Sequence, residues 1–227
     1  MRVLAIPDIH APAEHPDCWE FLEYVRDFYR PNKVVCLGDE LDAHTLSRWA
    51  KDPDLPAAGD ELNKAIEHLQ NLYKLFPNLL LAESNHTSRP YRLAKENGIP
   101  KALMRGYHEW LKAPKGYKWA EHHEIDGVIY THGDPYSGPN ATKKLVELHG
   151  QSVVHGHVHS HAAVHAFPDR AGLVWGANAG CLINRHHPAF SYAKGTAKPW
   201  LGVALVDNGV PRLLPMLLDK KGRWVER

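Results

Sequence analysis

Residues 33–42 read KVVCLGDELD, and this stretch decides the fold of the chain. Its apolar run from Val34 to Leu37 predicts a short strand, buried on both faces, that stops at Gly38. Asp39 then lies just past the carboxyl end of the strand, where open α/β sheets gather their ligand-binding groups. Because a carboxylate has two oxygen atoms, Asp39 can bridge two cations, which a single imidazole cannot do.

The same pattern, an apolar run followed by a metal-binding side chain, recurs along the chain. The further cases are Asp8 and His10 after residues 3–6, Asn85 after 79–82, His132 after 128–130, and His157 with His159 after 153–154. Each motif alone is typical of a turn or of a surface pair. Their recurrence at the ends of predicted strands indicates a single site for two metal ions, with Asp39 at its centre.

All of these candidates offer nitrogen or oxygen atoms, and none is a thiolate. Such a set suits Mn, Fe, Zn, Co or Ni and argues against a structural zinc site or soft copper. Two ions about 3.5–4 Å apart can hold a phosphoryl group and lower the pKa of a bridging water. The hydroxide then attacks phosphorus in line, and an acid must protonate the leaving oxygen atom. His86, next to Asn85, is the candidate acid.

Composition sets limits on the class of protein. The 227 residues carry a formal charge of +1, which gives no overall attraction to long nucleic acid or to an anionic membrane. Three scattered cysteines, Cys18, Cys36 and Cys181, predict no disulfide framework, and we expect a cytoplasmic protein. The apolar N-terminal run ends too early for a signal peptide, and no run approaches the ~18 residues of a membrane span.

The pattern of apolar residues predicts one α/β domain over residues 1–227. Its first half reads as a βαβ unit: strands at 3–6, 33–37 and 79–82, with helices over 18–29 and 59–76. A helical insertion is expected at about 87–115, broken at Asn97-Gly98. Beyond it, the pattern predicts a hairpin of 117–125 with 128–131, a helix over 141–149, strands near 152–155, 162–167 and 173–177, and a closing hairpin of 200–206 with 210–217. Such an order favours two sheets that share one core.

Together the motifs resemble those of the calcineurin-like metallophosphoesterase family, of the bacterial or bacteriophage type. The family patterns are DxH, GDxxD, GNH(D/E), (G)H and GHxH. They are matched over residues 1 to about 180 by Asp8-Ile9-His10, Gly38-Asp39-Glu40-Leu41-Asp42, Ser84-Asn85-His86-Thr87, Thr131-His132-Gly133 and Gly156-His157-Val158-His159. The resemblance implies a four-layer α/β/β/α sandwich of two mixed sheets, with a dinuclear metal site between them. One ion would be held by Asp8, His10, Asp39 and His159, and the other by Asp39, Asn85, His132 and His157.

Three positions depart from the family patterns. Ser84 replaces a glycine, and Thr87 replaces the carboxylate that follows the acid histidine, so we expect His86 to lack a carboxylate partner. Ala43 stands where protein phosphatases of the family carry a phosphate-clamping arginine. Arg48 and Arg89 are expected at the surface rather than in its place.

These observations predict a metal-dependent phosphodiesterase that acts on a small or short substrate, with two divalent ions, manganese first. His86 is the expected acid, Asp42 is expected to orient a ligand or a substrate group, and Arg185 and Lys194 in the irregular segment 180–199 are expected to contact the substrate. Three alternatives stay open: a phosphomonoesterase on a nucleotide or sugar phosphate, a nuclease on single-stranded nucleic acid, and a metal-bound scaffold without turnover. No membrane partner is expected, and the oligomeric state stays open.

Overall fold

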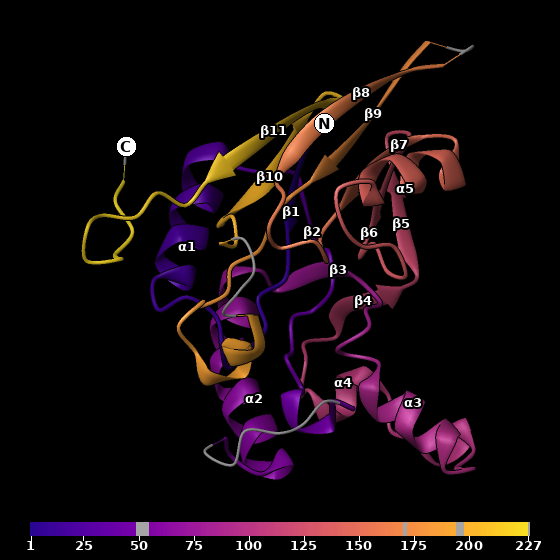
Figure 1. Ribbon diagram of the computed structural model, residues 1–227, viewed down its shortest axis with the longest axis vertical. Coiled ribbons are helices and arrows are strands. Elements are labelled where there is room, and N and C mark those ends of the chain that lie inside the picture. The colour runs from indigo at the N-terminus through magenta and orange to yellow at the C-terminus, as the bar shows by residue number, and fades with distance from the viewer. Residues whose placement is uncertain (49–54, 170–171, 194–197, 227) are drawn as a thin grey trace.

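The computed structural model describes residues 1–48, 55–169, 172–193 and 198–226, and it is built around two β-sheets (Figure 1). The first sheet has the strand order β11-β10-β1-β2-β3-β4 and the second the order β5-β6-β7-β9-β8. The strands of the first sheet are β1 (Arg2–Ile6), β2 (Lys33–Cys36), β3 (Asn78–Ala82), β4 (Gly116–Ala120), β10 (Gly202–Asp207) and β11 (Val210–Pro215). Those of the second are β5 (His122–Ile125), β6 (Val128–Thr131), β7 (Ser152–His155), β8 (Ala163–Asp169) and β9 (Gly172–Asn178).

Both sheets are mixed. In the first, β1, β2, β3 and β4 run parallel, whereas β10 is antiparallel to β1 and β11 is antiparallel to β10. In the second, β6, β7 and β9 run parallel, and β5 and β8 are antiparallel edge strands. Apolar residues of the two sheets meet in a shared core, in which Val35 and Leu37 face the same cluster as Tyr130 and Val154.

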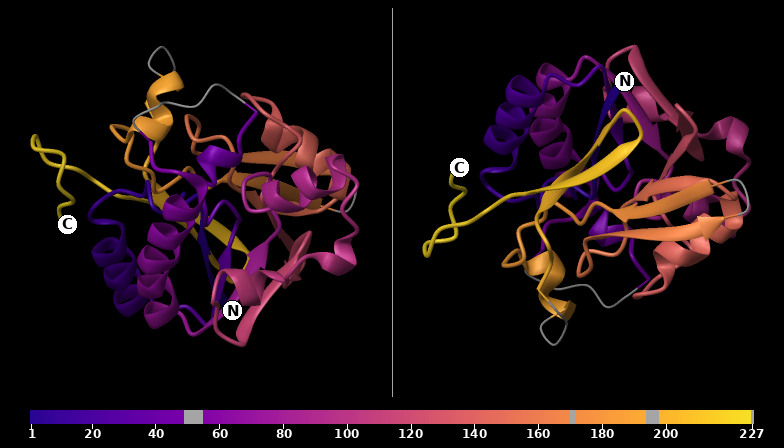
Figure 2. Two further views of the ribbon diagram at one scale, coloured as in Figure 1. Left: turned by 90° about the horizontal axis from the view of Figure 1, so that it is seen from below. Right: turned by 90° about the horizontal axis from the view of Figure 1, so that it is seen from above.

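Helices cover the outer face of each sheet. The helices α1 (Cys18–Tyr29) and α2 (Ala58–Leu75) lie side by side against the first sheet, where Leu22 and Leu69 are fully buried (Figure 2). The helix α5 (Ala141–His149) packs on the second sheet through Leu145 and Val146. The four-layer α/β/β/α sandwich expected from the sequence is therefore confirmed. No helix in the described part of the chain is both long enough and apolar enough to cross a membrane.

One expected hairpin is confirmed only for its second half, 122–125 with 128–131. The run 117–125 was expected to form one strand, but the chain leaves the first sheet after Ala120 and enters the second at His122. Its first part, β4, pairs in parallel with β3, and only β5 pairs with β6. A strand pattern shows which residues are extended, and it does not show in which sheet each residue finds its hydrogen-bonding partner.

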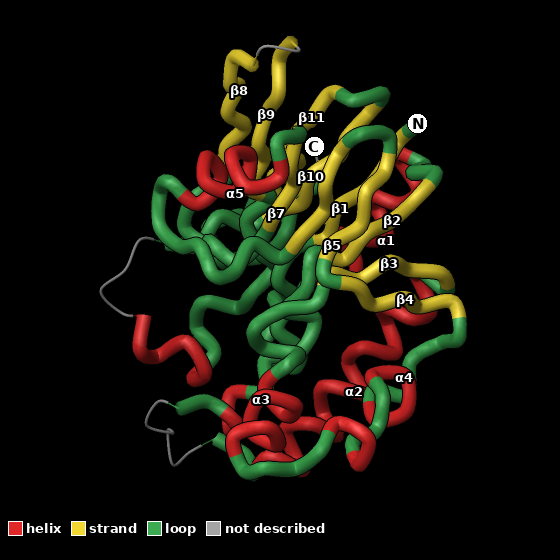
Figure 3. The backbone as a smooth tube through the Cα atoms, turned by 90° about the vertical axis from the view of Figure 1, so that its right-hand side faces the viewer, coloured by secondary structure: helices red, strands yellow, loops and turns green. Residues whose placement is uncertain are grey.

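The connection from β3 to β4 contains the expected helical insertion. It forms α3 (Arg89–Glu96), a short 3₁₀ turn at Lys101–Leu103 and α4 (Tyr107–Trp110). α3 stops at Asn97-Gly98, where Gly98 has a φ of +72°. Seen from the side, the loops that follow the strands gather below the sheets, between them and the helices α2 and α3 (Figure 3). The predicted ligands lie in these loops.

Candidate metal centre

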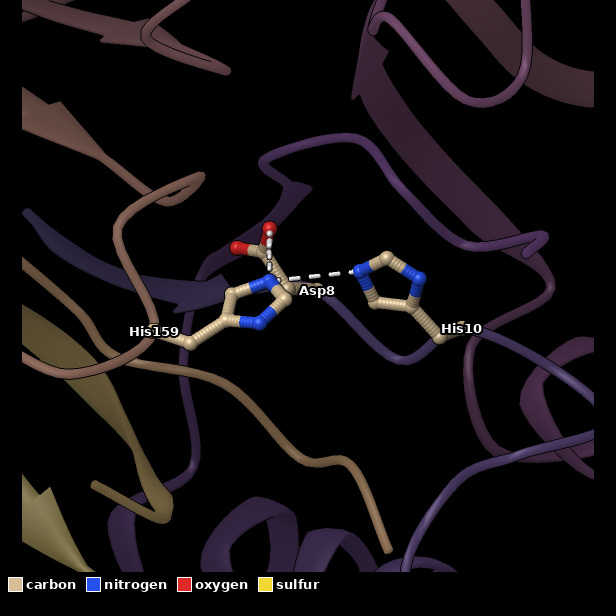
Figure 4. A group of neighbouring side chains, drawn as sticks. All are labelled: Asp8, His10 and His159. Carbon is tan, nitrogen blue, oxygen red and sulfur yellow. Dashed lines mark hydrogen bonds and ion pairs between the residues drawn. The ribbon is translucent and has the colours of Figure 1, made fainter. Parts of the chain in front are cut away.

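Three side chains from opposite ends of the chain meet in a first group (Figure 4). The Nε2 atom of His159 lies 3.3 Å from Oδ1 of Asp8 and 3.3 Å from Nε2 of His10. Their ligand atoms all lie within 4.8 Å of one another, and Asp8 and His10 are buried. The backbone N–H of His157 donates to both oxygen atoms of Asp8 at 3.0 Å, which fixes that carboxylate. This group has the donor atoms and the spacing of a site for one metal ion.

A second group contains Asp39, His132 and His157, and Asn85 adjoins it. The Nε2 atom of His132 lies 3.3 Å from Oδ2 of Asp39, 3.1 Å from Nδ1 of His157 and 2.7 Å from Oδ1 of Asn85. The Nδ1–H of His132 donates to the backbone oxygen atom of Leu37 at 3.0 Å, so Nε2 is the ring nitrogen that faces the group. This backbone contact orients the ring as in the metal-binding histidines of other proteins.

Asp39 connects the two groups. Its Oδ2 atom lies 3.4 Å from Nε2 of His10 and 3.3 Å from Nε2 of His132. Burial acts to raise the pKa of Asp39, but the neighbouring His132 and His86 hold it well below its usual value. Burial likewise acts to lower the pKa of His132, and Asp39 outweighs it and raises that pKa to about 10. The buried carboxylates thus favour positive charge between the two groups, and the donor set fits two divalent cations.

The backbone that carries these ligands is unusual. Four of them, Asp8, His10, Asp39 and His157, have φ values between +30° and +65°. Residues other than glycine rarely adopt this left-handed region, which costs on the order of 1–3 kcal/mol at each position. The geometry turns each side chain off the end of its strand and into the site.

Gly156 packs closely against the carboxylate of Asp8 in the first group. A Cβ atom added there would lie 2.0 Å from Oδ2 of Asp8. We therefore expect Gly156→Ala to displace this carboxylate and to lower metal affinity at the first group by about 10- to 100-fold, as the loss of a ligand's orientation does elsewhere. Bound metal per chain after dialysis measures the effect. Gly106→Ala is the matched control, because a Cβ atom there meets no atom within 4 Å. Equal metal content in both variants would contradict the prediction.

Asp42 lies between the first group and the predicted acid. Its Oδ1 atom is 2.8 Å from Nδ1 of His10 and 3.1 Å from Nδ1 of His86. Burial acts to raise the pKa of Asp42, and its contacts with His10 and His86 lower it far below the usual value. The expectation that His86 lacks a carboxylate partner is therefore wrong. Asp42 takes that position, although Thr87 follows the histidine in sequence.

Arg89 is the residue that sequence reasoning placed wrongly. It is partly buried rather than a surface residue, and its Nη1 donates to the backbone oxygen atoms of Asp42 at 2.8 Å and of Ala43 at 3.0 Å. Its Nη2 lies 2.9 Å from Nε2 of His86. A guanidinium therefore reaches the position beside Ala43 from another part of the chain. The sequence signal that could have found Arg89 is its position three residues after His86, at the start of a helix.

Polar side chains around the ligands hold their loops in place. The hydroxyl of Ser84 accepts the N–H of Asp39 at 2.9 Å, which a glycine at this position could not do. The carboxylate of Glu61, in the first turn of α2, accepts the N–H of His44 at 2.6 Å and of Thr45 at 3.0 Å. The hydroxyl of Thr87 donates to the buried Glu40 at 3.0 Å. The substitutions that depart from the family patterns are thus compensated by local hydrogen bonds.

The segment 180–199 contributes one wall beside the first group. The ring of Phe190 packs edge-on against His10 with centroids 5.5 Å apart, and His187 lines a cavity of about 270 Å³ together with Asp42 and His44. Arg185 is exposed, and its Nε donates to the ring of His186 at 3.1 Å. Lys194 lies outside the described residues. Of the two residues expected to contact the substrate, the described one, Arg185, therefore bonds to His186 rather than to a predicted metal ligand.

The comparisons with known proteins agree with the motifs. The family model of the calcineurin-like phosphoesterases matches residues 1–161. Among solved structures, the phosphoesterase Yfce of E. coli is 16% identical, with a TM-score of 0.48, and the match covers 100% of this chain and 97% of Yfce. Vps29 of Entamoeba histolytica is also 16% identical, with a TM-score of 0.43, over 91% of this chain and 86% of its own. No curated protein sequence matches the chain. The match over residues 1–161 shows that this chain belongs to the calcineurin-like phosphoesterase family.

Proposed function

We propose that this chain is a phosphoesterase with two divalent metal ions, Mn²⁺ first among the candidates, and that a phosphodiester is its preferred substrate. The observation that carries the proposal is the position of Asp39 Oδ2 between His10 and His132, at 3.4 Å and 3.3 Å. When bound, two ions would activate a water as nucleophile and stabilise the charge on the phosphoryl oxygen atoms. The remaining ligands are Asp8, Asn85, His157 and His159.

Neighbouring residues of the chain orient the imidazole of His86, the group proposed to protonate the leaving oxygen atom. An arginine has only donors, so the N–H of Arg89 must donate to Nε2 of His86, and Nε2 carries the lone pair in this arrangement. The Nδ1–H of His86 donates to the backbone oxygen atom of Asp42 at 2.6 Å, beside that residue's carboxylate. A phosphate oxygen atom that takes the Arg89 donor would free Nε2, which could then take up a proton from solvent water and pass it to the leaving oxygen atom.

Charge favours the diester. The Asp42 carboxylate and the Arg89 guanidinium belong to one cluster and cancel in formal charge, since Arg89 bonds to the backbone oxygen atom of Asp42 at 2.8 Å. A monoester carries nearly two negative charges at neutral pH, and a diester carries one. Because the Asp42–Arg89 cluster adds no net positive charge, it does not offset the additional charge of a monoester. Hydrolysis of a phosphomonoester is the second candidate, and the specific observation in its favour is that a guanidinium does lie beside Ala43.

A pair of matched substrates separates these candidates. We expect kcat/KM for an aryl phosphodiester to exceed that for the matching monoester by roughly tenfold, the equivalent of about 1.4 kcal/mol. The measurement is made at pH 7.5 with saturating Mn²⁺, and Arg89→Gln is compared with the wild type. If the wild type prefers the monoester and Arg89→Gln loses that preference, the second candidate replaces the first. Arg185 stays a proposed substrate contact, to be tested as a rise in KM on Arg185→Ala.

A further inference from the structure

Three arginine side chains line one pocket beside the metal centre. The pocket has a volume of about 180 Å³, and its polar lining includes Arg48, Arg89, Arg92 and Asn85. Asn85 is also a predicted metal ligand, which lies 2.7 Å from His132. Asn85 therefore lies both at the pocket and at the site where a scissile phosphate would lie.

The positive charge of this pocket is only partly balanced. Arg48 forms an ion pair with Glu96, which lines the same pocket, and both side chains are exposed, by 76% and 43%. Exposed pairs of this kind contribute about 0–1 kcal/mol and are readily exchanged for another anion. Arg92 donates to the backbone oxygen atom of Asn85 at 2.6 Å, and Arg89 bonds to backbone oxygen atoms and to a histidine ring. Within the described residues, neither Arg89 nor Arg92 has a carboxylate within 4.0 Å.

With Arg89 balanced by Asp42, Arg48 and Arg92 against the single carboxylate of Glu96 leave a net positive charge that an anion would neutralise. Guanidinium groups bind phosphate through two parallel N–H···O bonds, and such charge-assisted bonds are about twice as strong as neutral ones. Burial lowers the pKa of Arg89 although the Asp42 carboxylate opposes that shift, and a guanidinium stays charged in proteins. The backbone contacts of Arg89 and Arg92 fix two of the groups before a ligand arrives, which reduces the entropy lost on binding.

We propose that Arg48 and Arg92 in this pocket bind a second phosphate of the substrate, next to the phosphate that is hydrolysed beside Arg89 and His86. The preferred substrate is then a phosphoester that carries another phosphate close by. That phosphate can come from the neighbouring linkage of a short nucleic acid strand or from the polyphosphate chain of a nucleotide. The proposal rests on the proposed function for the scissile phosphate, and it adds the substrate class.

Binding of three thymidine nucleotides tests the pocket separately from turnover. Calorimetry with the full chain and Mn²⁺ compares thymidine 5′-monophosphate with thymidine 3′,5′-bisphosphate and thymidine 5′-diphosphate, and chromatography verifies that each ligand is intact. We expect one of the doubly phosphorylated ligands to bind at least about tenfold more tightly than the monophosphate. A preference for the bisphosphate indicates the nucleic acid spacing, and a preference for the diphosphate indicates the polyphosphate spacing. Equal affinity for all three overturns the proposal.

Four variants assign the preference to the pocket. Arg48→Gln and Arg92→Gln should each reduce the ratio between the doubly and singly phosphorylated ligands by roughly tenfold. Glu96→Gln should raise that affinity ratio severalfold, because it removes the carboxylate that competes with phosphate for Arg48. If the pocket residues only stabilised the fold, Glu96→Gln would not raise the ratio while the arginine variants lower it. Arg212→Gln, in β11 of the first sheet, is the matched loss of one positive charge and should leave the ratio unchanged. The proposal is overturned if the affinity ratio stays unchanged in both Arg48→Gln and Arg92→Gln, or if Arg212→Gln lowers it equally.

Turnover of a reporter distinguishes the two possible failures. The p-nitrophenyl ester of thymidine 5′-phosphate is compared with the same ester that carries a 3′-phosphate. If neither ester is hydrolysed, the proposed function fails, while the binding ratio still decides whether the pocket holds a second phosphate. If both esters are hydrolysed but the binding ratio is one, the phosphoesterase stands and the arginine pocket has no such role.

Discussion

Asp39→Asn should lose metal from both groups of ligands. Asp39 is the residue whose Oδ2 atom lies within 3.4 Å of both His10 and His132, and the substitution removes the charge that offsets two cations. Loss of a side chain that only orients a ligand costs about 10- to 100-fold in metal affinity, so we expect more than about 100-fold here. Metal per chain after dialysis, with increasing Mn²⁺ in the buffer, measures the loss.

Asn85→Ala is the matched control for Asp39. Asn85 contacts only the second group, through His132 at 2.7 Å, and its removal should weaken one ion and leave the other in place. An Asp39→Asn variant that keeps both ions, beside an Asn85→Ala variant that loses both, would refute the assignment of Asp39 as the bridge. Circular dichroism of both variants verifies that the fold is intact.

His86→Ala should keep its metal and lose rate, by about 10²- to 10⁴-fold if the histidine protonates the leaving group. An acid matters most when the leaving oxygen atom is a poor one. We therefore expect the full loss with an alkyl or nucleoside leaving group and a much smaller loss with p-nitrophenolate. The measurement is kcat for both kinds of diester in the wild type and the variant, with bound metal determined in each.

Arg89→Gln provides the comparison for His86. Arg89 contacts His86 but cannot donate a proton to a leaving group, because it stays charged throughout the accessible pH range. Loss of the Arg89 guanidinium should lower the rate of hydrolysis of both diesters by a similar factor. If His86→Ala also affects both diesters equally, His86 binds the phosphate and does not act as the acid.

Much of the fold could be predicted because its strands and helices contain clear apolar runs, and residues such as Gly38 show where these runs end. The strands β1, β2 and β3 and the helices α1 and α2 match the predicted ranges to within about one residue at most ends. The run 117–125 was predicted as one strand because its residues are extended throughout. The division at Glu121 depends on which sheet lies nearer, and no local pattern contains that information.

In the candidate site, too, some residues could be predicted from the sequence and others could not. The ligands Asp8, Asp39 and His132 could be found because each follows an apolar run, and the sheet brings the ends of such runs together. Arg89 could not be placed beside Ala43, since the path of the insertion and the start of α3 decide where its guanidinium points. The carboxylate partner of His86 was missed for a related reason: the Asp42 carboxylate contacts His86 across 44 residues of sequence.

The left-handed backbone at Asp8, His10, Asp39 and His157 has a consequence for how this sequence can change. Glycine has no steric penalty at such angles, so replacement of any of these residues by glycine relieves local strain while it removes a ligand. In the absence of metal, backbone stability and metal binding therefore favour different residues at the same positions. A library of variants screened for heat resistance without metal should accumulate glycine substitutions at these four sites, and a screen for bound metal should exclude them.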